Sequence, residues 1–342
     1  MKKHVGIAGL GFYTPDTFMT AKEISDATGS VWSEEAVIEK LGIIKKTIPG
    51  PDDGTQEMGY RAAKAALEKY NMNPLDIDLI ICIGEEWKEY PLTTSAIYIQ
   101  EKLGAYNAYG FDIQQRCCTC ITAMKVAKDM LQNDDSINTA LICGGYRNGD
   151  FIDYKNNRVS FMFNLGAAGA AMILKKNLGR NELLESSIMS DGSFARDAGV
   201  RYGGTVHPIT SENAVEAQKS LDIFDVEGMK KRLNEKSEPN FLAVVRAALR
   251  KSGYSQEDLN YLAILHFKRS AHKHMLDELG LDMSQSVYLE DYGHLGQLDQ
   301  ILSLMLAVEQ GKIKDGDIVA TVGAGIGYAW AANVIKWGPV QD

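Results

Sequence analysis

Apolar and polar positions alternate along this chain with two periods, one typical of strands and one typical of helices. Short apolar runs such as residues 79–84 (LIICIG) and 140–145 (ALICGG) predict buried strands. Between these runs, apolar side chains recur at helical spacing over residues 118–131, at Ile121, Met124, Val126 and Met130. The pattern predicts an α/β protein in which helices and strands follow one another.

Two parts of the chain repeat each other at long range. The stretch that begins at Ala65 (AALEKYNMNPLDIDLIICIG) matches, without a gap, the stretch that begins at Ala247 (AALRKSGYSQEDLNYLAILH). The strand at 140–145 likewise corresponds to residues 320–325 (ATVGAG), which follow a second predicted helix at 297–309. Two matches in the same order predict a duplicated α/β unit.

This duplication predicts the architecture. Two α/β halves, each with a buried strand-rich core, predict two packed sheets with helices between and outside them. We assign residues 1–175 to the first half and residues 176–342 to the second. A doubly wound dinucleotide-binding fold also fits the alternation of helices and strands. However, the nearest phosphate-binding signal, GLGFYTP at Gly9, lacks the spacing of a dinucleotide-binding loop.

Composition and charge argue against several classes of protein. Hydrophobic residues make up 45% of the chain and charged residues 24%, as in ordinary globular proteins. The 36 basic and 45 acidic side chains give a net charge of −9 without a run of basic residues, which argues against nucleic-acid binding. The N-terminus (MKKHVGIAGLGFY) has neither a secretory signal nor the about 20 apolar residues of a membrane span. We therefore expect a cytoplasmic protein with no membrane or nucleic-acid partner.

The five cysteines are a poor disulfide framework, because three of them crowd into one segment, QQRCCTCI. Cys117 and Cys120 have the spacing of a metal or redox pair. Zinc usually takes about four ligands, however, and the chain has no second CxxC and no HxxxH. We therefore predict no metal site.

Cys117 lies at a predicted corner between an extended stretch (GFDIQQR) and the helix at 118–131. A helix N-terminus stabilises a thiolate, and its free N–H groups can hold the oxyanion of a thioester. The matching corner of the second half carries His294, within DYGHLGQLDQ. An approximate two-fold axis would bring both corners to one cleft. The alternative is that Cys117 is a packed core residue.

Seven segments in a fixed order carry a family resemblance. They are VGIAGLGFYTP, EKLGIIKKTI, DIDLIICIG, GFDIQQRC, FNLGAAGAAMIL, YGHLGQLDQ and AGIGYAWAANVIKW. In these segments the chain resembles β-ketoacyl-acyl-carrier-protein synthase III. The resemblance implies a thiolase-like fold of duplicated α-β-α-β-α layers with two mixed five-stranded sheets. It also implies a homodimer, no metal or bound organic cofactor, and thioesters of coenzyme A or of acyl-carrier-protein phosphopantetheine as substrates.

The resemblance places the family's nucleophile at Cys117, which would take an acyl group from the thioester donor. In the family, a His and an Asn then hold a malonyl thioester while carbon dioxide leaves. Here His294 occupies the position of the Asn, and an imidazole can also act as a base. Asp299 would orient it, giving a Cys117–His294–Asp299 triad that resembles synthase-III-like acyltransferases. Alternatively, Asp299 only caps or solvates the helix start.

The family's other His falls on His266 if one residue is shifted, and on Leu265 without the shift. His266 is therefore a candidate catalytic residue. We expect His272 and His274 to be solvated helix residues. The Pro and Asn that flank the family's His are absent here, which weakens the case for standard decarboxylation.

The family's adenine-stacking aromatic falls on Ala36, and the Arg near it falls on Lys40. One phosphate contact is thus kept at Lys40 and the stacking platform is lost, which favours a carrier-protein donor. Trp32 or Trp87 can supply a substitute platform.

The family's C-terminal glycine loop, whose middle N–H completes the oxyanion hole, falls on Gly325, Ile326 and Gly327. A backbone N–H is present in every residue except proline, so the hole can persist with Ile326 in the middle. The alternative is a simple tight turn between strands.

Three functions remain open. The first is condensation of an acyl-cysteine with a malonyl-type thioester, and the second is transfer of the acyl group to a hydroxyl or amine. The third is an inactive partner subunit of a condensing complex, against which the retained Cys117 argues. The acyl chain cannot be read from the sequence, because bulky residues shape either an acyl pocket or plain core: Phe161, Met162, Phe163, Ile188 and Met189.

Overall fold

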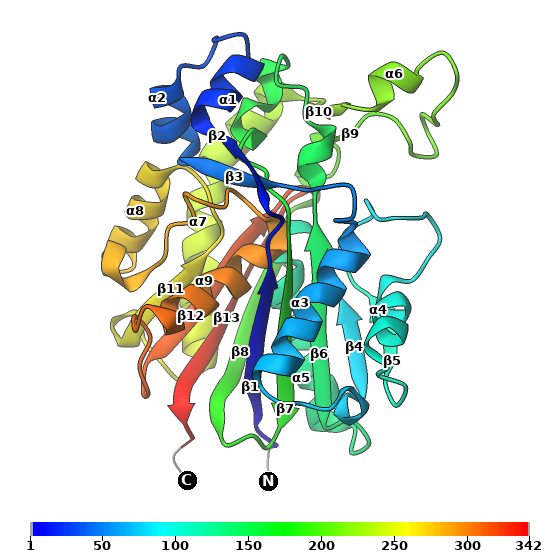
Figure 1. The fold of residues 1–342 in the computed structure, drawn as a ribbon. Helices are drawn as coiled ribbons and strands as arrows, with labels where there is room; N and C mark the ends of the chain where they lie inside the picture. The colour runs from blue at the N-terminus through cyan, green and yellow to red at the C-terminus, as the bar shows by residue number, and fades with distance from the viewer. Residues whose placement is uncertain (1–2, 341–342) are drawn as a thin grey trace.

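Nine strands join in one mixed β-sheet in the computed structural model, which describes residues 3–340 (Figure 1). The strand order across this sheet is β11-β12-β13-β8-β1-β7-β6-β4-β5. The strands are β1 (Val5–Tyr13), β4 (Leu79–Cys82), β5 (Tyr109–Asp112), β6 (Thr139–Tyr146), β7 (Ala168–Lys176), β8 (Arg180–Ser190), β11 (Leu259–Ile264), β12 (Ile318–Gly325) and β13 (Ala329–Pro339). Two short strand pairs stand apart from it: β2 (Thr17–Thr20) with β3 (Lys45–Ile48), and β9 (Ala198–Val200) with β10 (Leu221–Ile223).

The large sheet has two halves, which meet where Gly6 of β1 pairs with Glu182 of β8. Strands β1, β7, β6, β4 and β5 belong to the first half of the chain, and β8, β13, β12 and β11 belong to the second. The expectation of two five-stranded sheets is therefore wrong in detail. Within the described residues, five strands of one half and four of the other form one continuous sheet.

The second half lacks a counterpart of β5 because its backbone is bound elsewhere. The residues before His294 hold the place in chain order that β5 holds before Cys117. The carbonyl oxygen of Glu290 accepts hydrogen bonds from the backbone N–H groups of Ile44 (2.8 Å) and Lys45 (3.3 Å). This segment is thus hydrogen-bonded to the part of the chain between β1 and α3 that carries β2 and β3, and it does not extend the sheet.

The helices form three layers around the two half-sheets (Figure 1). In the middle layer, α5 (Thr119–Asn133) and α9 (Asp299–Glu309) contact strands of both halves. On the outer faces lie α3 (Thr55–Lys69) and α4 (Ser95–Leu103) on the first half, and α7 (Val226–Lys251), with α8 (Arg269–Glu278) beside it, on the second. The shorter α1 (Ala21–Ala27), α2 (Glu34–Ala36) and α6 (Ala214–Ala217) lie beyond the strand ends. No helix within residues 3–340 combines the length and apolar content that crossing a bilayer requires.

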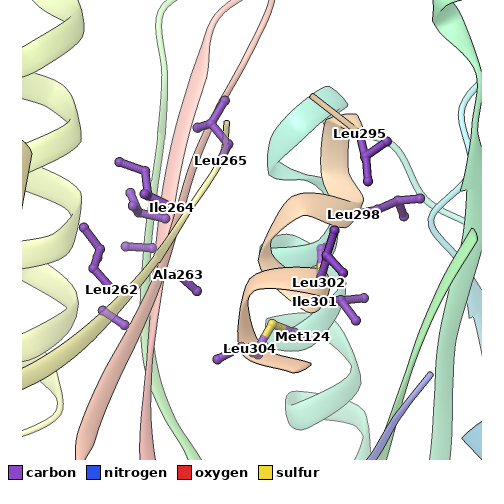
Figure 2. Close-up of a cluster of buried hydrophobic side chains, with 14 of the residues drawn as sticks. Met124, Leu262, Ala263, Ile264, Leu265, Leu295, Leu298, Ile301, Leu302 and Leu304 are labelled. Atoms are coloured by element: carbon purple, nitrogen blue, oxygen red, sulfur yellow. The ribbon is translucent and has the colours of Figure 1, made fainter. Parts of the chain in front are cut away.

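The first part of α9, residues 299–304, is buried on every face, as expected for a helix in a middle layer, whereas Val308 and Glu309 at its end are exposed. Figure 2 shows Leu298, Ile301 and Leu302 along this helix, with Met124 of α5 and residues 262–265 of the β11 region in the same cluster. Three polar side chains in this part of α9 are buried as well: Asp299, Gln300 and Ser303. A carboxylate at the start of α9 is therefore held away from solvent by the architecture itself.

The observed elements repeat in the predicted order. Helix α3 and strand β4 correspond to α7 and β11, and α5 and β6 correspond to α9 and β12. A single 3₁₀ turn stands between helix and strand in both halves, at Pro74–Asp76 and at Gln256–Asp258. Strand β4 runs parallel to β6, as β11 does to β12. These correspondences confirm the predicted duplication.

Helix α3 lies close to the sheet because glycines line the contact. A Cβ atom on Gly169 of β7 would lie 2.0 Å from the carbonyl oxygen of Met58, and one on Gly59 would lie 2.8 Å from the Cα of Gly144. Non-bonded heavy atoms do not approach this closely in a well-packed protein. The contact therefore requires glycine at these positions, or a shift of α3.

Replacing Gly169 by Ala should destabilise the protein, because the new methyl group would push α3 off the sheet. We expect the free energy of unfolding to fall by about 1–3 kcal/mol, as for other overpacked sites. Urea unfolding followed by circular dichroism measures this change. Gly192→Ala is the control, because nothing lies within 4 Å of a Cβ atom at Gly192. Equal midpoints for the two variants would contradict the close-packing argument.

Candidate active site

Cys117 lies in a sharp turn between β5 and α5. The turn is a 3₁₀ segment, Arg116–Cys118, and α5 begins at Thr119. Arg116 has a φ of 52°, a left-handed conformation that is uncommon for a residue with a side chain. This corner holds Cys117 at the start of the central helix with its side chain buried.

Two glycines of β12 allow the strand to press against this corner. A Cβ atom on Gly323 would lie 2.8 Å from the carbonyl oxygen of Cys117, and one on Gly325 would lie 2.6 Å from that of Gln115. Gly325 therefore has a packing role behind the nucleophile. Of the other two residues of the predicted loop, Ile326 lines the same cavity as Cys117, and Gly327 has a φ of 123°, which glycine readily adopts.

Cys117, His294 and Asp299 form a hydrogen-bonded chain. The Sγ atom of Cys117 lies 3.3 Å from Nε2 of His294, and Nδ1 of His294 lies 2.6 Å from Oδ2 of Asp299. Asp299 is completely buried, and it also accepts hydrogen bonds from the backbone N–H groups of Leu295 and His266, each at 2.7 Å. A carboxylate in this position orients the imidazole, so the alternative of a solvated residue at the helix start does not describe it.

The charges around His294 favour its protonated form. Burial lowers the pKa of His294, but the carboxylate of Asp299 and the sulfur of Cys117, through charge and hydrogen bonds, outweigh it. The pKa of His294 therefore lies well above its ordinary value. An imidazolium beside a cysteine at a helix N-terminus is the arrangement that favours a reactive thiolate.

The backbone of His294 is held by the segment that precedes β7. Its N–H donates to the carbonyl oxygen of Asn164 and its own carbonyl accepts from the N–H of Gly166, both at 2.9 Å. Gly293, with a φ of 80°, permits this approach, because a Cβ atom there would lie 2.4 Å from the same Asn164 oxygen. The position of His294 is thus set by the first half of the chain.

A buried lysine holds that segment in turn. Nζ of Lys46, on β3, donates to the carbonyl oxygens of Phe163 and Leu165 at 2.8 Å and lies 2.7 Å from the hydroxyl of Tyr154. Lys46 is almost completely buried, and this burial lowers its pKa to about 7. Nothing in the sequence distinguished Lys46 from the neighbouring Lys45, because the partners of Lys46 are more than a hundred residues away.

His266 enters the site through its backbone. Its N–H donates to Asp299, while Nε2 of its ring lies 3.3 Å from the carbonyl oxygen of Leu41. Burial lowers the pKa of His266 to about 4, so the ring is neutral at physiological pH. Both His266 and Leu265 line the cavity that contains Cys117.

The two following histidines differ from each other. The expectation that His272 is solvated is wrong: it is buried, its Nε2 lies 3.0 Å from the hydroxyl of Ser286, and burial lowers its pKa to about 3. The reason is that the helix α8 directs this side chain toward the protein interior, against Ser286. His274 is half exposed and lies 3.0 Å from the carboxylate of Glu238.

A cavity of about 600 Å³ connects these residues to the surface. This volume is in the range of small-molecule sites. Phe161 and Met162 line it, as does the predicted phosphate contact Lys40. Phe163 instead packs against Trp32 and Tyr154. Ile188 packs against a separate small cluster and Met189 is exposed, so these bulky residues divide between cavity, core and surface.

Trp32 is the tryptophan that lies next to Lys40. The Nζ atom of Lys40 is 6.0 Å from the centre of the Trp32 ring. Trp87 packs elsewhere, with its ring 4.5 Å from that of Phe151 and its Nε1 donating to Asp150. Ala36, which stands at the position of the family's adenine-stacking aromatic, is the last residue of the short helix α2, in the same part of the chain as Trp32 and Lys40.

Metal ligation has no visible basis in the part of the chain that the structure describes. Residues 3–340 contain no cluster of three or more His, Cys, Asp or Glu side chains that could hold a metal ion. Cys117 and Cys120, like the other cysteines, are free thiols. The side-chain groups that the structure brings together at the site are the thiol of Cys117, the imidazole of His294 and the carboxylate of Asp299.

Duplicated α/β halves with a cysteine at the start of a central helix define a thiolase-like fold. Comparisons with known proteins agree. The chain is 28% identical to β-ketoacyl-[acyl-carrier-protein] synthase III of Syntrophomonas wolfei, over 99% of both chains. The solved structure of synthase III from Thermus thermophilus has a TM-score of 0.84 at 21% identity and covers 98% of this chain and 100% of its own. OleA from Xanthomonas campestris has a TM-score of 0.82 at 18% identity, with coverage of 98% and 100%.

The family itself is identified by two sequence matches. The family description 3-oxoacyl-[acyl-carrier-protein] synthase III matches residues 111–192, and the description of its C-terminal part matches residues 249–337. Together these matches take in half of the chain. The chain belongs to the 3-oxoacyl-[acyl-carrier-protein] synthase III family.

Replacing Asp299 by Asn removes the charge behind His294 and keeps the size of the side chain. We expect the pKa of His294 to fall, because burial then acts without the opposing carboxylate. We also expect alkylation of Cys117 by iodoacetamide at neutral pH to slow by about tenfold or more, since the thiolate loses its imidazolium partner. NMR titration of histidine-labelled protein and mass spectrometry measure the two effects. The exposed neighbour Asp291→Asn is the control, and an unchanged His294 pKa in the Asp299 variant would contradict the assigned role.

Proposed function

We propose that this protein is a β-ketoacyl-acyl-carrier-protein synthase III-type enzyme. It forms an acyl-cysteine at Cys117 from an acyl thioester and condenses it with a malonyl-type thioester. The observation that carries the proposal is the contact of 3.3 Å between Sγ of Cys117 and Nε2 of His294, at the start of a buried helix and at the wall of a large cavity. Family membership supports the same reaction.

In the first half-reaction, the thiolate of Cys117 attacks the carbonyl carbon of the donor thioester. Backbone N–H groups at the start of α5 and at Ile326 hold the oxyanion that forms. The carbon–sulfur bond to the donor then breaks, and the donor thiol leaves with the proton carried by His294. The acyl group is left on Cys117, and His294 is left neutral because its proton has gone with the donor thiol.

In the second half-reaction, His294 takes up a proton from solvent at Nε2, and a malonyl-type thioester binds with its carbonyl oxygen at this atom. Loss of carbon dioxide leaves an enolate, which the imidazole stabilises by donating a hydrogen bond. The enolate carbon attacks the acyl carbonyl, a carbon–carbon bond forms, and the thiolate of Cys117 is released. We assign His266 a positioning role through its backbone bond to Asp299, because its ring is directed at the carbonyl of Leu41.

Acyl transfer to a hydroxyl or amine is the second candidate function. The observation that favours it is the contact of 2.6 Å between Nδ1 of His294 and the buried carboxylate of Asp299. This contact makes the neutral imidazole of the acyl-enzyme a competent base, which the family's usual Asn cannot be. The same triad argues against an inactive partner subunit.

The donor and the assembly belong to the proposal as well. We propose coenzyme A or acyl-carrier-protein phosphopantetheine thioesters as donors, with Lys40 beside Trp32 as a phosphate and stacking contact. No metal or organic cofactor takes part, because thiol, imidazole and backbone donors suffice for thioester exchange. By family resemblance we propose a homodimer in the cytoplasm, with no nucleic acid or membrane as a partner.

Incubation with acyl donors tests the first half-reaction. We expect the purified protein to gain the mass of one acyl group, located on Cys117 by peptide mass spectrometry, from a coenzyme A or a carrier-protein thioester. Cys117→Ala should gain none, and Cys120→Ala should label like the wild type, because Cys120 is completely buried. A wild-type protein that stays unmodified by every donor would overturn the proposed function.

Replacing His294 by Asn separates the two candidate functions. The Asn is the family's usual residue, so condensation with a malonyl thioester should persist within about tenfold of the wild type. Transfer to a hydroxyl or amine should fall by about a hundredfold or more, because the base is lost. Product masses from acyl-loaded enzyme with each acceptor measure both rates. A wild type that acylates amines and forms no β-ketoacyl product would establish the second candidate instead.

A further inference from the structure

A buried carboxyl group lies beside Arg116, the residue that precedes the nucleophile, and has no part in the reaction described above. Glu85 follows β4, and its side chain is more than nine-tenths buried. Its Oε2 atom accepts a hydrogen bond from the side chain of Asn148 and lies 3.5 Å from Nη1 of Arg116, the residue before Cys117. A carboxyl group at this depth needs a reason, because burial without compensation is costly.

The ends of two parallel strands bring this group to the cavity. Strands β4 and β6 are parallel neighbours, so the residues that follow them meet at the same edge of the sheet. Asn148, which follows β6, lines the cavity together with Cys117 and with Tyr146, whose ring lies 6.4 Å from that of His294. Glu85 therefore stands behind a cavity-lining amide and close to the reacting atoms.

The cluster is short of positive charge and of hydrogen-bond donors. The single guanidinium of Arg116 faces two carboxylates, Glu85 and the exposed Glu86, the latter at 2.9 Å. Both polar contacts that the structure shows for Glu85 are made by its Oε2 atom. Burial raises the pKa of Glu85, although Arg116 and Asn148 oppose this.

We infer that Glu85 and Asn148 select the acyl group that Cys117 carries, and that this group bears a hydroxyl or amino substituent near its thioester carbonyl. The inference rests on the proposed function, because it concerns the acyl-cysteine of that reaction. A plain hydrocarbon chain packed against Asn148 would displace water from the amide and from the carboxyl group behind it. The chain could not replace the hydrogen bonds that this water makes. A hydroxyl or ammonium group would donate to them instead. Glu85 and Asn148 are thus specificity-determining residues.

Chain-matched donors test this inference. The 3-hydroxybutyryl and 3-methylbutyryl thioesters of coenzyme A differ by a hydroxyl in place of a methyl group, and the β-alanyl and butyryl thioesters differ by an ammonium in place of a methyl group. In at least one of the two pairs, we expect the polar donor to acylate Cys117 about tenfold or more faster than the hydrocarbon donor. In Glu85→Met and in Asn148→Leu this ratio should fall to about one. Glu86→Gln is the matched control and should keep the wild-type ratio.

The outcomes separate this inference from the proposed function. Acylation of Cys117 at equal rates, or faster by the hydrocarbon donors, would overturn the inference and leave the acyl-enzyme intact. A role of Glu85 only in holding the Arg116 corner would slow both members of each pair alike and keep the ratio, which also overturns it. Protection of Cys117 from iodoacetamide by 3-hydroxybutyramide, compared with 3-methylbutyramide, gives a binding readout without turnover. Equal protection by the two amides would overturn the inference even if no donor reacts.

Discussion

The buried carboxylate of Asp299 is the interaction on which the geometry of the site depends. It accepts from the imidazole of His294 and from the backbone N–H groups of Leu295 and His266. Breaking such a network by removing a partner typically costs about 3–5 kcal/mol, because a charge is left uncompensated in the interior. Its donors come from the end of β11, from the turn before α9 and from a side chain. The charge can therefore be buried only when all three are in place, and the fold and the site stabilise each other.

Close backbone packing puts the nucleophile within reach of that network. Gly323 and Gly325 let β12 lie directly behind Cys117, and Gly293 lets the turn of His294 lie against Asn164. Each contact joins one half of the duplicated fold to the other. Lys46 supports the contact at Asn164 from within the first half, because it binds the carbonyl oxygens on either side of that residue. Main-chain contacts thus bring together the Cys117 corner and the His294 corner, which lie on opposite halves, in one site. Few side-chain changes can disturb such contacts.

The cavity has walls of two kinds, and their chemistry has different origins. The apolar wall, with Phe161 and Met162, continues the hydrophobic core toward the surface. The polar wall, with Asn148 and Tyr146 in front of Glu85, lies where parallel strands end and backbone and side-chain polar groups converge. Cys117 therefore lies between an apolar surface and a surface that offers hydrogen-bonding groups.

The sequence by itself determined the features that can be predicted from the order of residues along the chain. Hydrophobic periodicity located the helices and strands, and internal repetition revealed the duplication. The order of motifs marked Cys117, His294 and Asp299. Only the tertiary structure decided how segments far apart in the chain meet: the nine strands in one sheet, the inward turn of His272, and the contacts of Lys46 with Leu165 and of Glu85 with Asn148. The physical reason is that periodicity records which face of an element is buried. The residues that this buried face contacts depend on sheet order, register and close glycine contacts. These exist only after the two halves have packed together.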